Sequence, residues 1–398
     1  MAAQQLATRT ARAPPEPEFV LRGHSHAVTA LRFLDEQRLV SGDVGGHCLL
    51  WNLATRRPVQ NWAAAPLGVL ELHAHAGGLL TQTRDGRIRL WDLENLAEPT
   101  TTLATNSFFF ARCATVGHSE DYAAPPLPSI PKETTRPAKK AESGIGAQLA
   151  SDDDGEEEEA SMPPAKRWCD HVGHARHLVL APTEPPEATL LWDTRQSQPA
   201  LKLAPDAGDR TLVRKGDASV LGNAMAMRLW LPQSQPSSKP PLALVGHENG
   251  RVLAWDLAMP VPQICAKTPR DSFSSPNVAL DVNEEGTLLF AGGVEATAKA
   301  FRVEPGLLKP HGSLEVTCAS INELDQHPGV GQLALRGDDK VIASAGWDYR
   351  VRLFATKSLR RLAVLRYHDA SVNALDWSSD LLATGSKDTK VAVWRLAF

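Results

Sequence analysis

The sequence predicts an all-β fold, a single seven-bladed β-propeller closed into a ring. The first observation is a pattern that recurs seven times in the 398 residues: an apolar strand, a Gly/Ser/Asp turn, and a second apolar strand ending in Trp or Phe. The second is the spacing of these aromatic residues, because its minimum of 40 residues is the period of a four-stranded blade, and longer intervals mark loops. The aromatic residues of the seven copies are Trp51, Trp91, Trp192, Trp255, Phe301, Phe354 and Trp394.

Each copy is expected to supply antiparallel strands joined by tight turns. The strand that carries the aromatic residue places β-branched or aromatic residues at every second position, as a half-buried sheet requires. A turn of the Asp-Gly, Asn-Gly or Asp-Thr kind precedes it, which is hairpin chemistry. Further strands are predicted at 28–33, 69–73, 79–83, 278–282, 341–346, 372–377 and 381–386, with a weaker fourth strand after the aromatic residue, as at 360–366.

The two ends of the chain predict how the ring closes. The last copy ends at Phe398, shortly after its aromatic strand, and so lacks a fourth strand. Residues 18–23 form a strand-like segment ahead of the first copy. Because an unpaired edge strand is a liability, we expect this N-terminal strand to complete the last blade and close the ring. The propeller is therefore expected to span 18–398, after a disordered tail at 1–17.

An acidic, Pro-rich segment at 117–167 interrupts the third copy. It holds eleven Asp/Glu, six Lys/Arg and almost no apolar side chains, so we expect a disordered insertion in the third blade. Its Ser151, followed by three Asp, fits a site for an acidophilic kinase, whose phosphate would dock on Arg/Lys clusters. A second Pro/Ser-rich stretch, 231–241, is predicted to be a loop of the fourth blade. Two basic pairs in the acidic segment are a candidate bipartite nuclear import signal: Lys139, Lys140, Lys166 and Arg167.

Bulk properties argue against several classes of function. A net charge of −4 gives no electrostatic footprint for nucleic acid, and no apolar run approaches a membrane span. Five scattered cysteines and the lack of a secretory signal indicate a reducing compartment, the nucleus or the cytoplasm. No nucleophile or phosphate-binding motif indicates an enzyme, so no cofactor and no small-molecule substrate is expected. No metal site is expected either, because carboxylates and cysteines at ligand spacing are missing around His73, His75, His171, His174 and His177.

The repeated pattern resembles the WD-repeat family of β-propellers. In that family a His, a strand Ser/Thr, the turn Asp and the strand Trp form a hydrogen-bonded tetrad inside the blade. The resemblance assigns a complete tetrad to the last blade: His368, Thr384, Asp388 and Trp394. It assigns a partial one to the sixth blade, where Phe replaces Trp and cannot donate an indole N–H: His327, Ser344 and Asp348.

Other blades depart from the family pattern. The second keeps the turn Asp85 but shows no obvious His. The first has His24, yet Gly45 stands where the Asp is expected. In the fourth, His247 belongs to a Gly-His pair but lies out of register, in the turn. The blades are therefore expected to differ in regularity, most of all in the middle of the chain.

The two ends of the chain also resemble a narrower family. The opening at 15–33 and the stretch from Val341 to Trp394 resemble the ASTRA-associated protein 1 family, whose vertebrate relatives are called guanine nucleotide-binding protein β-subunit-like protein 1. The resemblance implies a non-enzymatic scaffold in the ASTRA complex, which is linked to chromatin remodelling. It further implies a role in the assembly and stability of phosphatidylinositol-3-kinase-related kinases with their co-chaperone complex, and a nuclear location.

Two other functions are compatible with a propeller. A G-protein β-like signalling subunit is disfavoured, because residues 1–17 are short and Pro-rich and leave no helix to coil with a γ partner. A histone reader that uses the central channel is compatible with the scaffold and is not separated from it by sequence. An enzyme with its site at the channel mouth would need strongly perturbed carboxylates or histidines there.

Residues for protein partners are predicted from the register of the turns. In WD-repeat propellers the residue just before the turn Asp points outward on the face around the channel mouth. An exposed Trp at such a position would be a natural hot spot, whereas packing against the neighbouring blade is the alternative. The candidates are Arg84, Glu248, Trp347 and Lys387.

Overall fold

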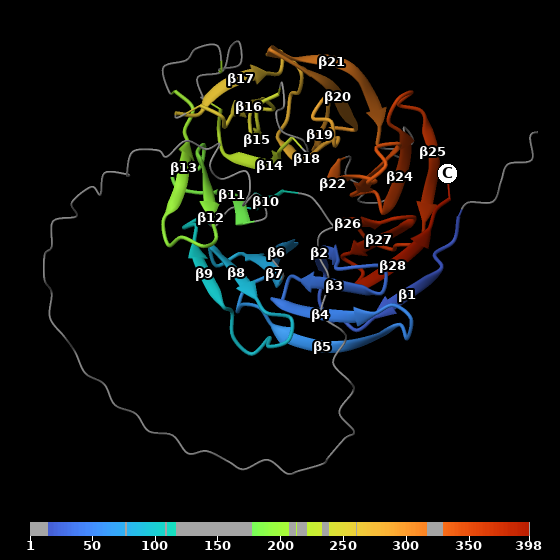
Figure 1. Ribbon diagram of the computed structural model, residues 1–398. Helices are drawn as coiled ribbons and strands as arrows, with labels where there is room; N and C mark the ends of the chain where they lie inside the picture. Colours follow the sequence, from blue (N-terminus) through green and yellow to red (C-terminus); the bar gives the residue numbers. More distant parts are fainter. Residues whose placement is uncertain are drawn as a thin grey trace, which may run out of the picture.

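The structure is a computed structural model, and it describes residues 15–75, 78–107, 110–116, 177–206, 212, 221–232, 239–259, 261–316 and 329–397. Its described elements are all β-strands, arranged around a central axis as a ring (Figure 1). The strands form five four-stranded sheets and one eight-stranded sheet. The eight-stranded sheet consists of two four-stranded groups, joined by a short parallel pairing of β17 with β21. The predicted all-β propeller fold is confirmed.

The blades follow one another around the ring, and the first strand of each lies innermost (Figure 1). Blade 1 consists of β2 (Val28–Phe33), β3 (Arg38–Asp43), β4 (His47–Asn52) and β5 (Arg57–Ala63). Blade 2 consists of β6 (Val69–His75), β7 (Gly78–Thr83), β8 (Arg87–Trp91) and β9 (Thr101–Ala104). Blade 3 consists of β10 (Ala114–Thr115), β11 (Leu178–Pro182), β12 (Thr189–Asp193) and β13 (Pro199–Leu203).

The remaining blades continue in chain order. Blade 4 consists of β14 (Ala224–Trp230), β15 (Leu242–His247), β16 (Val252–Asp256) and β17 (Gln263–Lys267). Blade 5 consists of β18 (Asn277–Val282), β19 (Leu288–Gly293), β20 (Thr297–Glu304) and β21 (Gly306–Glu315). Blade 6 consists of β22 (Val330–Leu335), β23 (Val341–Gly346), β24 (Arg350–Ala355) and β25 (Arg361–Arg366). Blade 7 combines β26 (Val372–Ser378), β27 (Leu381–Ser386) and β28 (Lys390–Arg395) with β1 (Phe19–Arg22).

The N-terminal strand closes the ring as predicted. β1 pairs antiparallel with β28, from Phe19 opposite Val393 to Arg22 opposite Lys390. The last blade thereby gains its outer strand from the other end of the chain, and its edge is covered. Closure is therefore built from backbone hydrogen bonds rather than from a covalent connection.

The hydrophobic core lies between the blades. Buried apolar residues of the described ranges form seven clusters, and each cluster draws its members from two neighbouring blades. The cluster at the closure joins Leu21, Val28 and Trp51 to Ala383 and Val393. Each blade thus buries both faces of its sheet, which explains why the strands carry nearly continuous apolar runs.

Each of two predicted irregular segments connects two strands of the same blade, one in blade 3 and the other in blade 4. Residues 117–176 connect β10 with β11 of blade 3, so the predicted insertion at 117–167 lies outside the described residues. The loop predicted at 231–241 connects β14 with β15 of blade 4, and its ends match the strand bounds. Most of the N-terminal tail predicted at 1–17 also lies outside the described residues.

Candidate functional site: polar networks and the upper face

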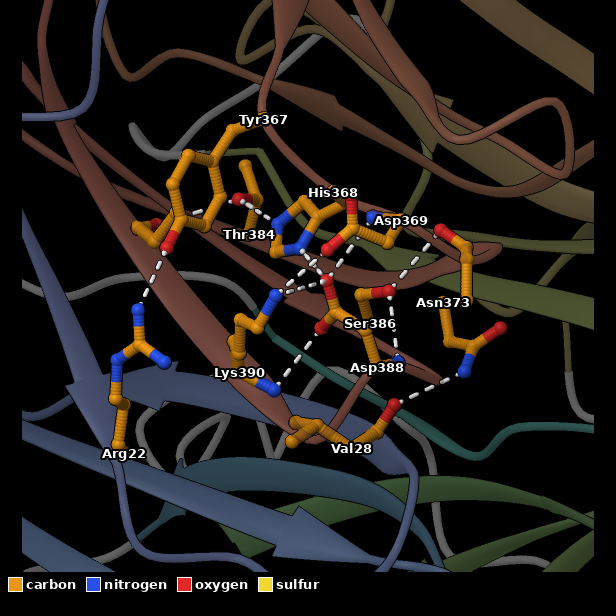
Figure 2. A network of polar contacts seen from close by, with 12 residues as sticks. Arg22, Val28, Tyr367, His368, Asp369, Asn373, Thr384, Ser386, Asp388 and Lys390 are labelled. Carbon is orange, nitrogen blue, oxygen red and sulfur yellow. Dashed lines mark hydrogen bonds and ion pairs between the residues drawn. The ribbon is translucent and has the colours of Figure 1, made fainter.

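In blade 7 the four residues assigned by the family pattern form one hydrogen-bonded chain. Figure 2 shows three of them: His368, Thr384 and Asp388. The indole Nε1 of Trp394 donates to Thr384 Oγ1 at 3.1 Å, and Thr384 Oγ1 lies 2.8 Å from His368 Nε2. The Nδ1 of His368 lies 3.0 Å from Asp388 Oδ2. The chain ties the link into the blade, which carries His368, to the second and third strands.

The carboxyl of Asp388 is held in its ionised form. Burial by itself would raise its pKa, but the hydrogen bond and charge of His368 and the backbone N–H groups of Lys390 and Asp369 outweigh burial. The pKa of Asp388 accordingly falls from 3.8 to about 2. The network therefore stabilises the fold as a charged unit.

Blade 1 contains a second complete network, which the sequence reading missed. His24 Nδ1 lies 2.8 Å from Asp43 Oδ2, His24 Nε2 lies 2.6 Å from Ser41 Oγ, and Trp51 Nε1 donates to Ser41 Oγ at 2.7 Å. The family pattern expects the acid at position 45, where this chain has Gly45. The structure corrects this expectation, because Asp43, two residues earlier, supplies the carboxylate. The carboxylate still accepts the backbone N–H groups of the turn. The sequence signal for this network was His24 without an acid at position 45 but with Asp43 two positions earlier.

The Asp43–His24–Ser41 connectivity is that of a serine-hydrolase triad. A nucleophile must, however, reach a substrate, and the side chain of Ser41 is fully buried. Its oxygen also accepts the Trp51 indole N–H, so its lone pairs are directed into the blade. This arrangement is explained by blade stability rather than by nucleophilic catalysis.

Blades 2 and 6 use arginine at the centre of the network instead of histidine. Arg352 donates to both carboxylate oxygens of Asp348 at 3.0 and 2.6 Å, and both side chains are buried. Arg89 pairs with Asp85 in the same way at 3.2 and 2.5 Å. In each case the Arg follows the turn Asp by four residues, a spacing the sequence displays but the sequence reading did not use.

The partial tetrad predicted for blade 6 therefore needs revision. Its Asp348 is bonded to Arg352, and Ser344 Oγ donates to the Arg352 carbonyl at 3.5 Å. The assigned His327 lies outside the described residues. A guanidinium supplies two parallel donors to a carboxylate, which an imidazole cannot do, so Arg352 takes the place of a histidine as the side-chain partner of Asp348.

The inner strands are joined across blade boundaries by paired charges. Arg32 of β2 pairs with Asp376 of β26 at 3.3 Å, and Asp376 also accepts the Phe33 N–H at 2.6 Å. Arg228 of β14 pairs in the same manner with Asp281 of β18 at 3.1 Å. These ion pairs link the inner strands of neighbouring blades around the axis.

Arg112, just before β10, is a further link close to the axis. It lies 3.4 Å from Glu71 of blade 2 and donates to the carbonyl oxygens of Thr29 in blade 1 and Asn373 in blade 7. One side chain thus connects four blades, its own included. The described charges near the axis are largely engaged with one another.

The predicted partner residues lie on one end of the ring, called the upper face here. It carries the turn between the second and third strands of each blade and the links between blades. Glu248 and Lys387 are exposed there, while Arg84 and Trp347 are half-buried. Trp347 packs on the backbone of Gly329 and Gly331, where an added Cβ would lie 2.7 and 3.2 Å from its ring. This contact lies within blade 6, the blade of Trp347 itself, and Trp347 stays half-buried, so its packing against the neighbouring blade stays a prediction.

Exposed apolar side chains on the upper face gather over blades 1 to 3. Leu67 is 49% and Phe110 is 65% exposed. The backbone of Gly68 packs on Val44, and the Gly68 carbonyl accepts the Arg84 N–H at 2.9 Å. The Arg84 guanidinium lies 4.8 Å from the centre of the Phe110 ring. Three apolar residues and one cation on neighbouring turns and links are called the upper arc here: Val44, Leu67, Arg84 and Phe110.

Other histidines occupy structural positions. His247 is buried in β15, 3.4 Å from the Gly222 carbonyl, and burial lowers its pKa to about 4. It belongs to no tetrad, in line with its register. His73 and His75 are buried, the former against the Cys113 carbonyl at 3.2 Å. Across the described ranges, no group of three His, Cys, Asp or Glu side chains is placed to hold a metal ion.

Several predicted residues lie outside the described part of the chain. They are the candidate phosphorylation site and the candidate import signal: Ser151, Lys139, Lys140, Lys166 and Arg167. Within the described ranges, no helix has the length and apolar character needed to cross a membrane.

Comparison with known proteins agrees with this geometry. A family model described as "WD domain, G-beta repeat" matches residues 15–52 and 359–395, which hold the complete histidine networks of blades 1 and 7. These two segments of the chain are thus WD repeats. The chain is also similar to curated proteins along almost its entire length.

Three relatives illustrate the similarity. "Guanine nucleotide-binding protein subunit beta-like protein 1" of Mus musculus is 27% identical over 393 residues, covering 96% of this chain and 97% of the relative. "ASTRA-associated protein 1" of Schizosaccharomyces pombe is 25% identical, covering 96% and 99%. The protein of the same name from Schizosaccharomyces japonicus is 24% identical with the same coverage. The repeats and these relatives support a WD-repeat scaffold protein.

Proposed function

We propose that this protein is a non-enzymatic scaffold of an ASTRA-type complex, acting in chromatin remodelling and in the assembly and stability of phosphatidylinositol-3-kinase-related kinases with their co-chaperones. The observation that carries the proposal is the similarity to ASTRA-associated protein 1 over 96% of the chain. Its proposed partners are ASTRA subunits, these kinases and the co-chaperone complex, and its proposed location is the nucleus.

The upper arc supplies a surface for such a role. Exposed apolar side chains that adjoin one another, rather than being scattered singly, mark protein-interaction sites. A large aromatic side chain next to an Arg is the composition typical of interface hot spots. Phe110, stacked by Arg84 and 65% exposed, is therefore the proposed centre of the contact.

Affinity purification of the tagged full-length protein from its native cells, followed by mass spectrometry, tests the proposal. We expect ASTRA subunits, the large kinases or their co-chaperones to be recovered. Recovery of a γ-like subunit instead, or of general chaperones alone, would overturn the scaffold assignment.

A matched pair of variants tests the surface. Phe110→Ser removes the exposed ring of the upper arc, whereas Val261→Ser removes an apolar side chain that is 71% exposed at the opposite end of the ring. We expect Phe110→Ser to lose the partners and Val261→Ser to retain them. Equal recovery with both variants would remove the upper arc from the proposal.

A further inference from the structure

A second surface lies on the upper face between blades 6 and 7. The sequence from Tyr349 to His368 contains six Lys/Arg and no Asp or Glu. Those at the upper end, together with cations of blade 7, form a basic corner. The corner consists of Arg22, Arg350, Arg366, Lys387 and Lys390.

Two like-charged pairs face each other across strands in this corner. Arg350 of β24 lies directly opposite Arg366 of β25, and Arg22 of β1 lies directly opposite Lys390 of β28. Like charges at opposed positions destabilise a sheet. The arrangement is therefore unfavourable in the protein alone and becomes favourable when an anion lies between the charges.

The cations of the corner have few anionic partners. Lys390 is engaged by Asp369 at 2.8 Å and by Asp388 at 3.7 Å (Figure 2). The polar contact of the exposed Arg22 is to the neutral Tyr367 hydroxyl, at 3.4 Å. Among the described residues, no carboxylate forms an ion pair with Arg350, Arg366 or Lys387. Net positive charge thus remains exposed on a chain whose total charge is −4.

One connection holds these charges together. The connection between β25 and β26 contains Tyr367, whose hydroxyl accepts a hydrogen bond from Arg22. It also contains Ser371, which forms hydrogen bonds with the turns of blades 6 and 7. The hydroxyl of Ser371 donates to the Trp347 carbonyl at 3.0 Å, and its carbonyl accepts the Lys387 N–H at 2.9 Å. Two of the predicted partner residues therefore border the basic corner, and one of them is aromatic.

We propose that the basic corner binds an acidic peptide segment of a protein partner. Arginine forks bind carboxylates bidentately, and the partly exposed rings of Trp347 and Tyr367 offer apolar contact beside them. A peptide fits this corner better than a nucleic acid does, because the cations are confined to one corner and do not form a stripe along which a phosphate backbone could run. The inference rests on the proposed scaffold function and gives the chemistry of one partner segment.

Fluorescence anisotropy with the purified full-length protein tests the proposal. The probe is a fluorescein-labelled peptide of alternating Glu and Ser residues, with a Gln/Ser peptide as the uncharged control. We expect the acidic peptide to bind with an affinity that falls as salt is added, and the control peptide not to bind. Absence of binding at low ionic strength would overturn the proposal.

Two arginines of the same strand provide matched variants. Arg366→Glu reverses a charge within the basic corner, and Arg361→Glu reverses one at the opposite end of β25, opposite Phe354. We expect Arg366→Glu to weaken peptide binding about tenfold and Arg361→Glu to leave it within about twofold. Equal losses with both variants would identify general charge attraction and overturn the proposed corner.

Stability separates a lost binding site from a damaged fold. Because Arg366→Glu replaces a like-charged pair with an attractive one opposite Arg350, its Tm should equal or exceed that of the wild type. Lower stability together with lost binding would assign the residue a structural role and overturn the proposal. A single-stranded DNA oligonucleotide that binds as tightly as the peptide and displaces it would likewise overturn the peptide assignment.

The two proposals fail in distinguishable ways. Peptide binding at the corner without recovery of ASTRA-type partners from cells would leave the corner intact and sink the proposed complex. Recovery of those partners without peptide binding would sink the corner alone.

Discussion

The blades that meet at the closure of the ring and the two blades beside them bind the carboxylate of the turn between their second and third strands with different partners. In blades 1 and 7, His24 and His368 join the turn carboxylate to a strand hydroxyl and, through it, to a Trp indole. In blades 2 and 6 an Arg from the third strand binds the turn carboxylate directly. The histidine lies on the link that enters the blade, so its network connects this link to the blade. The arginine lies on the third strand, so its network connects only that strand to the turn before it.

The difference shows that the link-to-blade hydrogen bonds lie in the two blades next to the ring closure. The two ends of the chain meet inside blade 7, where β1 pairs with β28, and β1 leads directly into blade 1; blades 7 and 1 both carry the histidine network at full length. Blade 2 keeps a Trp91 indole bonded to Thr81 at 3.0 Å, separate from its Arg–Asp pair. The indole bond and the carboxylate bond are thus independent parts that each blade combines in its own way.

The largest expected effect comes from breaking the arginine network. Asp348→Ala leaves the Arg352 guanidinium, with a side chain only 3% exposed, without its carboxylate. An uncompensated buried charge costs about 3 to 5 kcal/mol. Urea denaturation should report this loss. The double variant Asp348→Leu with Arg352→Met removes both charges and should recover more than half of it, and failure to recover would show that packing, not charge, sets the cost.

The histidine network should give a smaller loss. His24→Ala removes two hydrogen bonds of a buried side chain and leaves Asp43 without its histidine partner. We expect the free energy of unfolding to fall by about 2 kcal/mol. His47→Ala, at an exposed position of β4, serves as the control and should change stability by less than about 0.5 kcal/mol. Equal effects of the two variants would mean that the buried network contributes little to closure.

Acid should weaken the histidine network in a defined window. The pKa of Asp388 is depressed in the folded state, from 3.8 to about 2, so its contribution is present above pH 3.8 and is lost as the pH falls toward 2. This difference corresponds to about 2 kcal/mol of unfolding free energy. Denaturation of the wild type and of Asp388→Asn across this range should show the difference between them shrinking as pH falls. A constant difference would contradict the assignment.

The smallest expected effect concerns the indole hydrogen bond alone. Trp394→Phe keeps an aromatic ring but removes the N–H that Thr384 accepts, for a hydrogen-bond cost of about 1 kcal/mol. Trp62→Phe is the matched control, because the buried Trp62 N–H has no partner among the described residues. Thermal unfolding should therefore show a larger loss for Trp394→Phe. A larger loss for Trp62→Phe would mean that the smaller ring, and not the lost hydrogen bond, determines the loss of stability.

The strands and the closure were predictable because they follow from local patterns. The predicted segments 28–33, 341–346 and 381–386 coincide with β2, β23 and β27. A repeat fixes the period, and a missing fourth strand at one end with a spare strand at the other leaves a single economical pairing. The blade 7 network was predictable as well, because its four residues sit at the family's usual spacing.

The polar networks of the other blades were not predictable in the same way. Asp43 replaces an acid expected two residues later, and its carboxylate reaches His24 because the turn folds back over it. Arg352 and Asp348 meet because the tight turn that holds Asp348 brings its carboxylate back to the third strand, which the sequence spacing permits but does not require. Local pattern fixes strands, whereas the partner of a buried charge is fixed by the space around it.

The sequence by itself determined a β-propeller of repeated four-stranded blades that is closed by its N-terminal strand. Hydrophobic periodicity and turn chemistry act between neighbours in the chain, and they leave their mark in the order of residues. Only the tertiary structure decided which side chains share a surface. The upper arc and the basic corner join residues from different blades, such as Arg22 and Tyr367, because closing the ring brings the two ends of the chain together.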